Sequence, residues 1–145
     1  MMRNNIGIAS TLKSRKIKVR EPIDERCWAF MKALRERNAT KRQYAVDPYA
    51  EVYRTRDNVF AILTESLGGA GDVWSYLILG PEKAMLIDTG YGVGDLKGLA
   101  DLLAGGKPLV VVNTHPHVDH ASGNCQFDRV YCHTYAVPQL AKMRT

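Results

Sequence analysis

Three features are scarce or absent in this chain of 145 residues, and each absence excludes a class of protein. Cysteine occurs only three times and forms no Cys-x-x-Cys pair, which argues against a disulfide framework and favours a reducing compartment such as the cytoplasm. No apolar run approaches the roughly 20 residues that cross a bilayer, so we expect no membrane partner. Residues 1–20 contain neither an apolar core nor a small-residue cleavage site, which argues against a secretory signal.

Acidic side chains are missing from the N-terminal segment. Residues 1–20 carry six of the 20 basic residues and none of the 15 acidic ones, so the net charge of +5 belongs to this leader rather than to the rest of the chain. We expect a solvated, disordered tail. A nucleic-acid contact is the alternative, and the leader has no aromatic residue that could stack on bases. We therefore do not expect nucleic acid as the partner.

The remaining residues are enough for one ordinary domain with an extension in front of it. Residues 21–48 are predicted to form a helix followed by a polar linker, because Ile23, Cys27, Met31 and Leu34 recur at helical spacing. Residues 49–145 alternate between strand and helix patterns, which predicts an α/β layered domain.

Several elements can be placed within that domain. A hairpin is expected around the turn residues 56–58, and the helix over 95–103 should direct Leu96, Leu99, Leu102 and Leu103 inward. The strand 109–112 is fully apolar, which predicts cover on both faces. The other expected elements are a flexible loop over 66–72, strands over 74–79, 84–87 and 128–132, a glycine-rich bend over 88–94, and a helix over 135–143 that Pro138 interrupts.

The glycines of the bend do not predict a nucleotide site. Gly90, Gly92 and Gly94 resemble a dinucleotide fingerprint in spacing, but the third glycine would fall at position 95, which is Asp95. The chain also lacks the Lys-Ser/Thr pair of a phosphate-binding loop.

Metal-ligand residues are dense directly after the strand 109–112. His115, His117, Asp119 and His120 fall within six residues, and zinc prefers imidazole nitrogens and carboxylate oxygens. In an extended stretch, side chains two residues apart point the same way, so His115 and His117 could reach one metal. Asp119 and His120 would then turn toward a second ion. The pattern predicts hydrolysis by metal-activated water.

These residues resemble a known family. Thr114-His115-Pro116-His117-Val118-Asp119-His120 is similar to the H-x-H-x-D-H signature of the metallo-β-lactamase-fold hydrolases, among them the glyoxalase II-like enzymes. Residues 76–80 and 84–90 resemble the two strands and the Asp-Thr-Gly bend that precede the signature, and residues 121–124 with Phe127 resemble the segment directly after it. The resemblance covers residues 49–145 and implies the first half of an αββα sandwich.

The resemblance also implies roles for single residues. His115 and His117 would bind a first metal, Asp119 and His120 a second, and Asp119 would orient the attacking water. Asp88 would hold ligand side chains in place from behind, although a simple turn aspartate is the alternative reading. The loop 66–72 would flank the substrate mouth. One or two zinc ions are expected, with iron and manganese as alternatives.

The chain departs from the family pattern in one respect. The second half of the fold, which supplies the remaining ligands in the family, is absent, so we expect a truncated chain whose inner sheet face needs an oligomer or a partner to cover it. Cys125 and His133 are the alternative ligands, against roles as a small core residue and a helix cap. The predicted function is hydrolysis of a small-molecule ester or thioester by metal-bound hydroxide. A non-catalytic metal-binding module completed by a partner chain is the alternative, and a phosphodiesterase is a weaker one.

Overall fold

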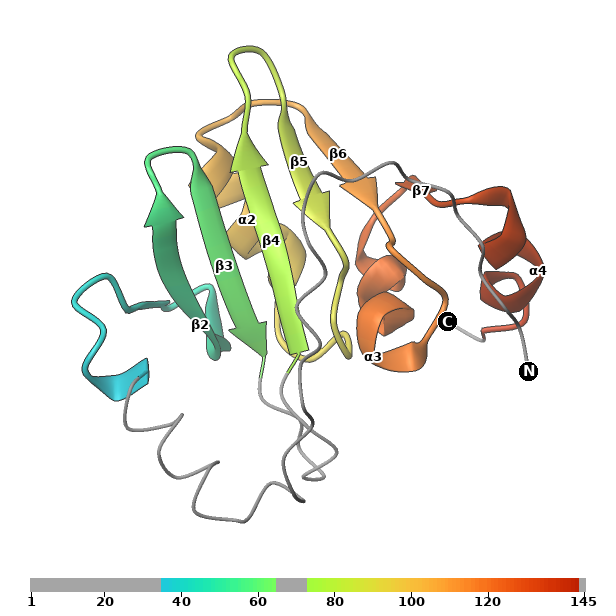
Figure 1. Cartoon of the computed structure of the whole chain (residues 1–145), viewed down its shortest axis with the longest axis horizontal. Coiled ribbons are helices and arrows are strands. Elements are labelled where there is room, and N and C mark those ends of the chain that lie inside the picture. The colour runs from blue at the N-terminus through green and yellow to red at the C-terminus, as the bar shows by residue number, and fades with distance from the viewer. Residues whose placement is uncertain (1–34, 65–72, 144–145) are drawn as a thin grey trace, which may run out of the picture.

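The computed structural model describes residues 35–64 and 73–143. Its centre is a seven-stranded sheet in the order β1-β2-β3-β4-β5-β6-β7 (Figure 1). Strands β1 to β5 pair antiparallel, whereas β5, β6 and β7 pair parallel, which confirms the α/β class. The strands are β1 (Arg42–Tyr44), β2 (Asp47–Arg56), β3 (Val59–Thr64), β4 (Val73–Leu79), β5 (Ala84–Ile87), β6 (Leu109–Val112) and β7 (Val130–Tyr131).

Helix α2 (Leu96–Ala104) connects the parallel strands β5 and β6 and lies behind the sheet in Figure 1. Asp95 caps its start by accepting a hydrogen bond from the Gly98 amide at 2.8 Å. Its buried stripe packs on a core that the sheet supplies from one face, with Leu99, Ile62, Leu77 and Leu86 fully buried. The prediction for Leu102 was wrong: it lies about a third of a turn off that stripe and is 57% exposed.

The opposite face of the sheet carries a second set of apolar side chains. Tyr53, Ala61 and Leu63 are buried there, and the ring of Trp74 lies 5.6 Å from that of Tyr53. Strand registry places Tyr76 and Met85 on the same face, 40% and 41% exposed. Among the described residues, no helix packs on this face. Strand β6 is accordingly half-buried except at Val111, so the described residues do not supply the cover that we expected on both its faces.

The polar segment that we expected to be a linker contributes to the sheet. Residues 42–44 form the edge strand β1, and β2 begins at Asp47, so the sheet starts before residue 49. Charged residues are typical of edge strands, because one side of such a strand lies open to water, and the hydrophobic pattern that identifies inner strands is absent. The hairpin around residues 56–58 is confirmed by the pairing of β2 with β3.

The C-terminal elements are shorter than predicted. Strand β7 contains only Val130 and Tyr131, and residues 135–143 form no continuous helix. The short helix η2 (Thr134–Ala136) is followed by α4 (Val137–Leu140), in whose first turn Pro138 lies. Proline begins this helix rather than interrupting it, because the first turn needs no amide hydrogen there.

Some predictions concern residues outside the described part of the chain. These are the leader 1–20, the apolar stripe of the helix after it, and the loop 66–72. Within the described ranges, no helix is long and apolar enough to cross a bilayer.

A buried carboxylate lies where the start of β2 meets the loop before α2. Asp47 is fully buried, its Oδ1 accepts the Tyr49 amide at 3.2 Å, and its Oδ2 has no hydrogen-bond partner. Gly94, in a left-handed conformation at φ 77°, allows this approach, since a Cβ there would lie 2.1 Å from Oδ1. Burial raises the pKa of the Asp47 carboxyl, and the nearby Asp95 carboxylate raises it further.

We predict that Asp47→Asn increases the free energy of unfolding at about pH 7, because the folded state then no longer buries a charge. Since the folded pKa is raised above its usual value, wild-type stability should fall as pH rises through the interval between the two values. The gain from Asp47→Asn should therefore shrink toward zero below that interval. Urea unfolding at several pH values measures this. Asp128→Asn, at an exposed position, is the control, and an equal gain from it would contradict the prediction.

Candidate metal centre

The candidate site is built where two parallel strands end together. Strand β5 is followed by Asp88, and β6 by Asn113, Thr114 and His115. The Asp88 amide donates to the Val112 carbonyl at 2.9 Å, so the strand pairing continues to the edge of the sheet. Because the carboxyl ends of neighbouring parallel strands meet at one edge, residues 26 apart in sequence come into contact there.

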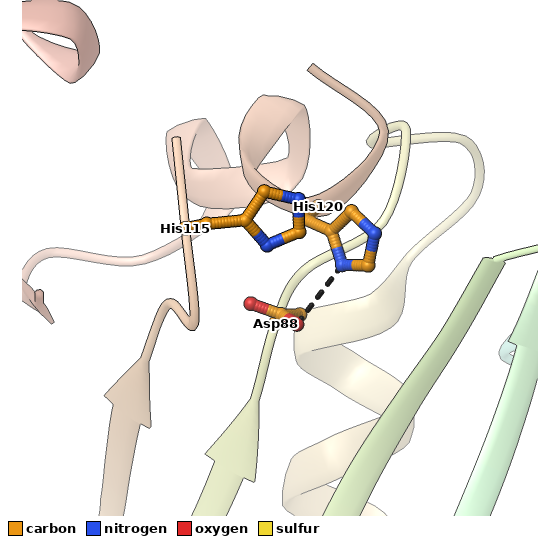
Figure 2. Close-up of side chains that lie close together, drawn as sticks. All are labelled: Asp88, His115 and His120. Carbon is orange, nitrogen blue, oxygen red and sulfur yellow. Dashed lines mark hydrogen bonds and ion pairs between the residues drawn. The ribbon is translucent and has the colours of Figure 1, made fainter. Parts of the chain in front are cut away.

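Asp88 links the segments that carry the candidate ligands. It is 4% exposed and adopts φ 61°, a left-handed conformation that aspartate tolerates better than most residues. Its Oδ1 accepts the Thr114 amide at 2.7 Å, and its Oδ2 accepts the Thr114 hydroxyl at 2.7 Å. His120 Nδ1 lies 3.0 Å from the same Oδ2 (Figure 2). These three contacts use most of the acceptor positions of the carboxylate.

These contacts favour one hydrogen-bond arrangement at two histidines. A carboxylate oxygen accepts hydrogen bonds, so His120 Nδ1 is the donor toward Asp88, and Nε2 lies on the side of Asp119. The single hydrogen of the Thr114 hydroxyl is directed to Asp88, so this hydroxyl acts as an acceptor for His115 Nδ1, 2.9 Å away. His115 Nε2 is then free. A neutral imidazole held in this way would keep Nε2 available for a metal ion.

The imidazole rings gather at this edge of the sheet. The His115 ring centroid lies 4.5 Å from that of His117 and 4.2 Å from that of His120. Asp88, His115 and His120 each place one potential ligand atom within 4.8 Å of the others. Asp119, at the start of helix α3 (Val118–Ala121), has Oδ2 3.4 Å from His120 Nε2. Imidazole nitrogens beside a carboxylate are the kind of ligands that a zinc ion prefers.

Of the residues that the sequence selected, Asp88, His115 and His120 place potential ligand atoms close to one another. His117 lies beside the ring of His115, and Asp119 lies beside His120, but neither belongs to that group of three. The roles of all five residues at a metal stay predictions. The alternative ligands are engaged elsewhere. His133 Nδ1 accepts the Tyr135 amide at 3.1 Å and caps η2, and the Cys125 thiol donates to the Ser122 carbonyl at 3.4 Å.

Sequence reasoning missed the buried polar residues behind the histidines. Thr89 and Asn113 are 1% and 3% exposed, and both hydrogen-bond to Asn124 in the short helix η1 (Ser122–Gln126). One signal was present in the sequence, since Thr89 and Asn113 each occur within two residues of the end of an apolar strand. A polar side chain at such a position needs a buried partner.

Known proteins resemble this chain in sequence. The human acyl-coenzyme A thioesterase MBLAC2 is 37% identical over 86 residues, which are 52% of this chain and 30% of that protein. The protein of the same name from Bos taurus is 35% identical over 89 residues, with the same two coverages. The chain thus spans about a third of the length of the curated relatives that it matches.

Solved structures resemble it in fold. A metallo-beta-lactamase from Erythrobacter litoralis superposes with a TM-score of 0.57 at 18% identity, covering 70% of this chain and 48% of that chain. This likeness supports the layered arrangement of the expected first half of the sandwich. The family model of the metallo-beta-lactamase superfamily matches residues 68–142, just over half of the sequence. Fold, motif and family model agree, and the chain belongs to the metallo-beta-lactamase superfamily.

Proposed function

We propose that this chain carries metal-binding residues of a hydrolase that cleaves small-molecule thioesters or esters. One observation carries the proposal: the His115 ring lies 4.5 Å from the His117 ring and 4.2 Å from the His120 ring, and Asp119 Oδ2 lies 3.4 Å from His120 Nε2. These side chains do not belong to the hydrophobic core, because they lie partly open to solvent at the edge of the sheet.

The residues divide into ligands and a support. His115 and His117 would hold one ion, and Asp119 and His120 would hold a second. Asp88 would serve as the support, because its oxygens already accept three hydrogen bonds and its contact fixes the ring of His120. We propose zinc, one or two ions, with iron or manganese as alternatives that the same donors accept.

The reaction can be written from the side chains of this chain. When bound, zinc would supply a Lewis acid and acidify a water molecule. The Asp119 carboxylate would accept a hydrogen bond from that water and orient its lone pair toward the substrate carbonyl. A new C–O bond forms, the C–S or C–O bond to the leaving group breaks, and the proton of the water passes to the departing thiolate or alkoxide. The three histidines keep the water and the carbonyl within reach of Asp119.

The substrate class rests on the relatives. Those with 35–37% identity are named as acyl-coenzyme A thioesterases, which favours an acyl-coenzyme A thioester over a lactam or a phosphodiester. The sparse cysteines suit the cytoplasm, where we propose that the chain acts.

We predict that Asp119→Asn lowers the rate of acyl-coenzyme A hydrolysis roughly 10²–10⁴-fold, because an amide accepts a hydrogen bond from water more weakly than a carboxylate and so orients the water less well. Release of the coenzyme A thiol, followed with a thiol reagent in the presence of zinc, measures it. His133→Ala is the matched control, since that histidine only caps η2. An equal loss in both variants would contradict the proposed role of Asp119. A wild-type chain that binds zinc but shows no turnover would favour the non-catalytic metal-binding module completed by a partner chain.

We further predict that zinc raises the melting temperature of the chain and that a chelator reverses the shift, as a ligand of the native state must do. Asp88→Asn should weaken zinc binding roughly 10–100-fold without removing a ligand. Titration calorimetry against a competing chelator measures the affinity. Asp101→Asn, on the exposed side of α2, should bind zinc as the wild type does. Unchanged affinity in Asp88→Asn would refute the supporting role.

A further inference from the structure

A closed ring of buried hydrogen bonds lies behind the histidine cluster. The Thr89 hydroxyl donates to Asn124 Oδ1 at 2.9 Å, and Asn124 Nδ2 donates to Asn113 Oδ1 at 2.7 Å. Asn113 Nδ2 in turn donates to the main-chain carbonyl of His120 at 3.2 Å. The Thr89 amide closes the ring by donating to the same carbonyl at 2.8 Å.

The ring joins three elements that are distant in sequence. Thr89 follows β5, Asn113 follows β6 directly, and Asn124 belongs to η1. Thr89 and Asn113 both donate to the carbonyl of His120, the residue whose ring contacts Asp88, and Asn124 links the two donors to each other. The Thr89 hydroxyl also lies 3.3 Å from that carbonyl, so it has a second acceptor within reach.

The helix that carries His120 cannot fix its own orientation. Helix α3 has only four residues, and a single turn is far below the length at which a helix is stable in water. Something outside the helix must therefore determine where the His120 ring points. Asp88 contacts the imidazole of His120, and the closed network of hydrogen bonds holds the backbone of His120 behind it.

Helix η1 can approach the end of β5 closely because residue 123 is a glycine and has no side chain. A Cβ at Gly123 would lie 2.2 Å from the Thr89 carbonyl oxygen and 3.0 Å from the Thr89 Cβ. Glycine at this position lets the two segments touch, and the Gly123 amide donates to the Gly90 carbonyl at 3.3 Å. This contact places Asn124 directly against Thr89.

We propose that Thr89, Asn113 and Asn124 are positioning residues, which hold the His120 backbone so that the imidazole Nδ1 faces Asp88 and the imidazole Nε2 faces Asp119. Thr89 is the centre of this arrangement, because both its amide and its hydroxyl take part. The orientation of the imidazole is a property of the metal-free chain. Only its consequence for metal binding rests on the proposed function.

The first test compares Thr89→Val, which keeps the shape but loses the hydroxyl, with Thr89→Ser, which keeps the hydroxyl. Two-bond ¹H–¹⁵N NMR spectra of the metal-free chain, recorded at the same pH for every variant, report the tautomer of His120 and the exchange of its Nδ1 hydrogen. We expect one Nδ1-protonated tautomer with slow exchange in the wild type and in Thr89→Ser. In Thr89→Val we expect a tautomer mixture and at least a several-fold faster exchange.

A control substitution in the hydrophobic core distinguishes a positioning role of Thr89 from a general effect on stability. Ile62→Val truncates a fully buried side chain of β3 and should lower global stability without altering the His120 spectrum. If Thr89→Val leaves the spectrum unchanged, or if Ile62→Val disturbs it equally, the positioning role is overturned.

Zinc affinity separates this proposal from the proposed function. We expect about 10-fold weaker zinc binding in Thr89→Val and wild-type affinity in Thr89→Ser and Ile62→Val. A wild-type chain that binds no zinc would overturn the proposed function, while the NMR comparison would still decide the positioning role. Zinc binding in the wild type together with an unchanged Thr89→Val spectrum would overturn the positioning role alone.

Discussion

The candidate site depends on the hydrogen bonds that the Asp88 carboxylate accepts. This carboxylate joins the ends of two parallel strands by accepting both the amide and the hydroxyl of Thr114, and it also contacts His120 Nδ1. Its left-handed backbone conformation costs on the order of 1 kcal/mol, which three hydrogen bonds to a charged acceptor offset. The carboxylate contacts the ring of His120 directly and reaches the ring of His115 through the Thr114 hydroxyl.

The fold brings this carboxylate to its partners through the α2 connection. The helix returns the chain so that β6 runs parallel to β5, and its buried stripe packs on the core beneath the sheet. Side chains that follow the two strands then meet at one edge, where ligands bind in many α/β proteins. The rigid strands locate Asp88 and Thr114, whereas the one-turn helix α3 relies on contacts with Asp88, Thr89 and Asn113.

The sequence predicts the elements whose pattern is local. Strand β5 is found at the predicted residues 84–87, because a turn precedes its apolar run and Asp88 comes directly after it. The density of His115, His117, Asp119 and His120 likewise identified the site. By contrast, β1 is a polar edge strand, and α4 depends on a proline in its first turn. The bond between Thr89 and Asn124 spans 35 residues, so no local pattern could indicate it.

The most direct test is X-ray absorption spectroscopy at the zinc edge on the chain loaded with substoichiometric zinc. Because the rings of His115, His117 and His120 cluster at the strand ends, we predict a first shell of nitrogen and oxygen with the outer scattering of two or more imidazoles. That outer scattering should weaken in His115→Ala. A shell of oxygen atoms alone, unchanged by the substitution, would contradict a metal centre at the ends of β5 and β6.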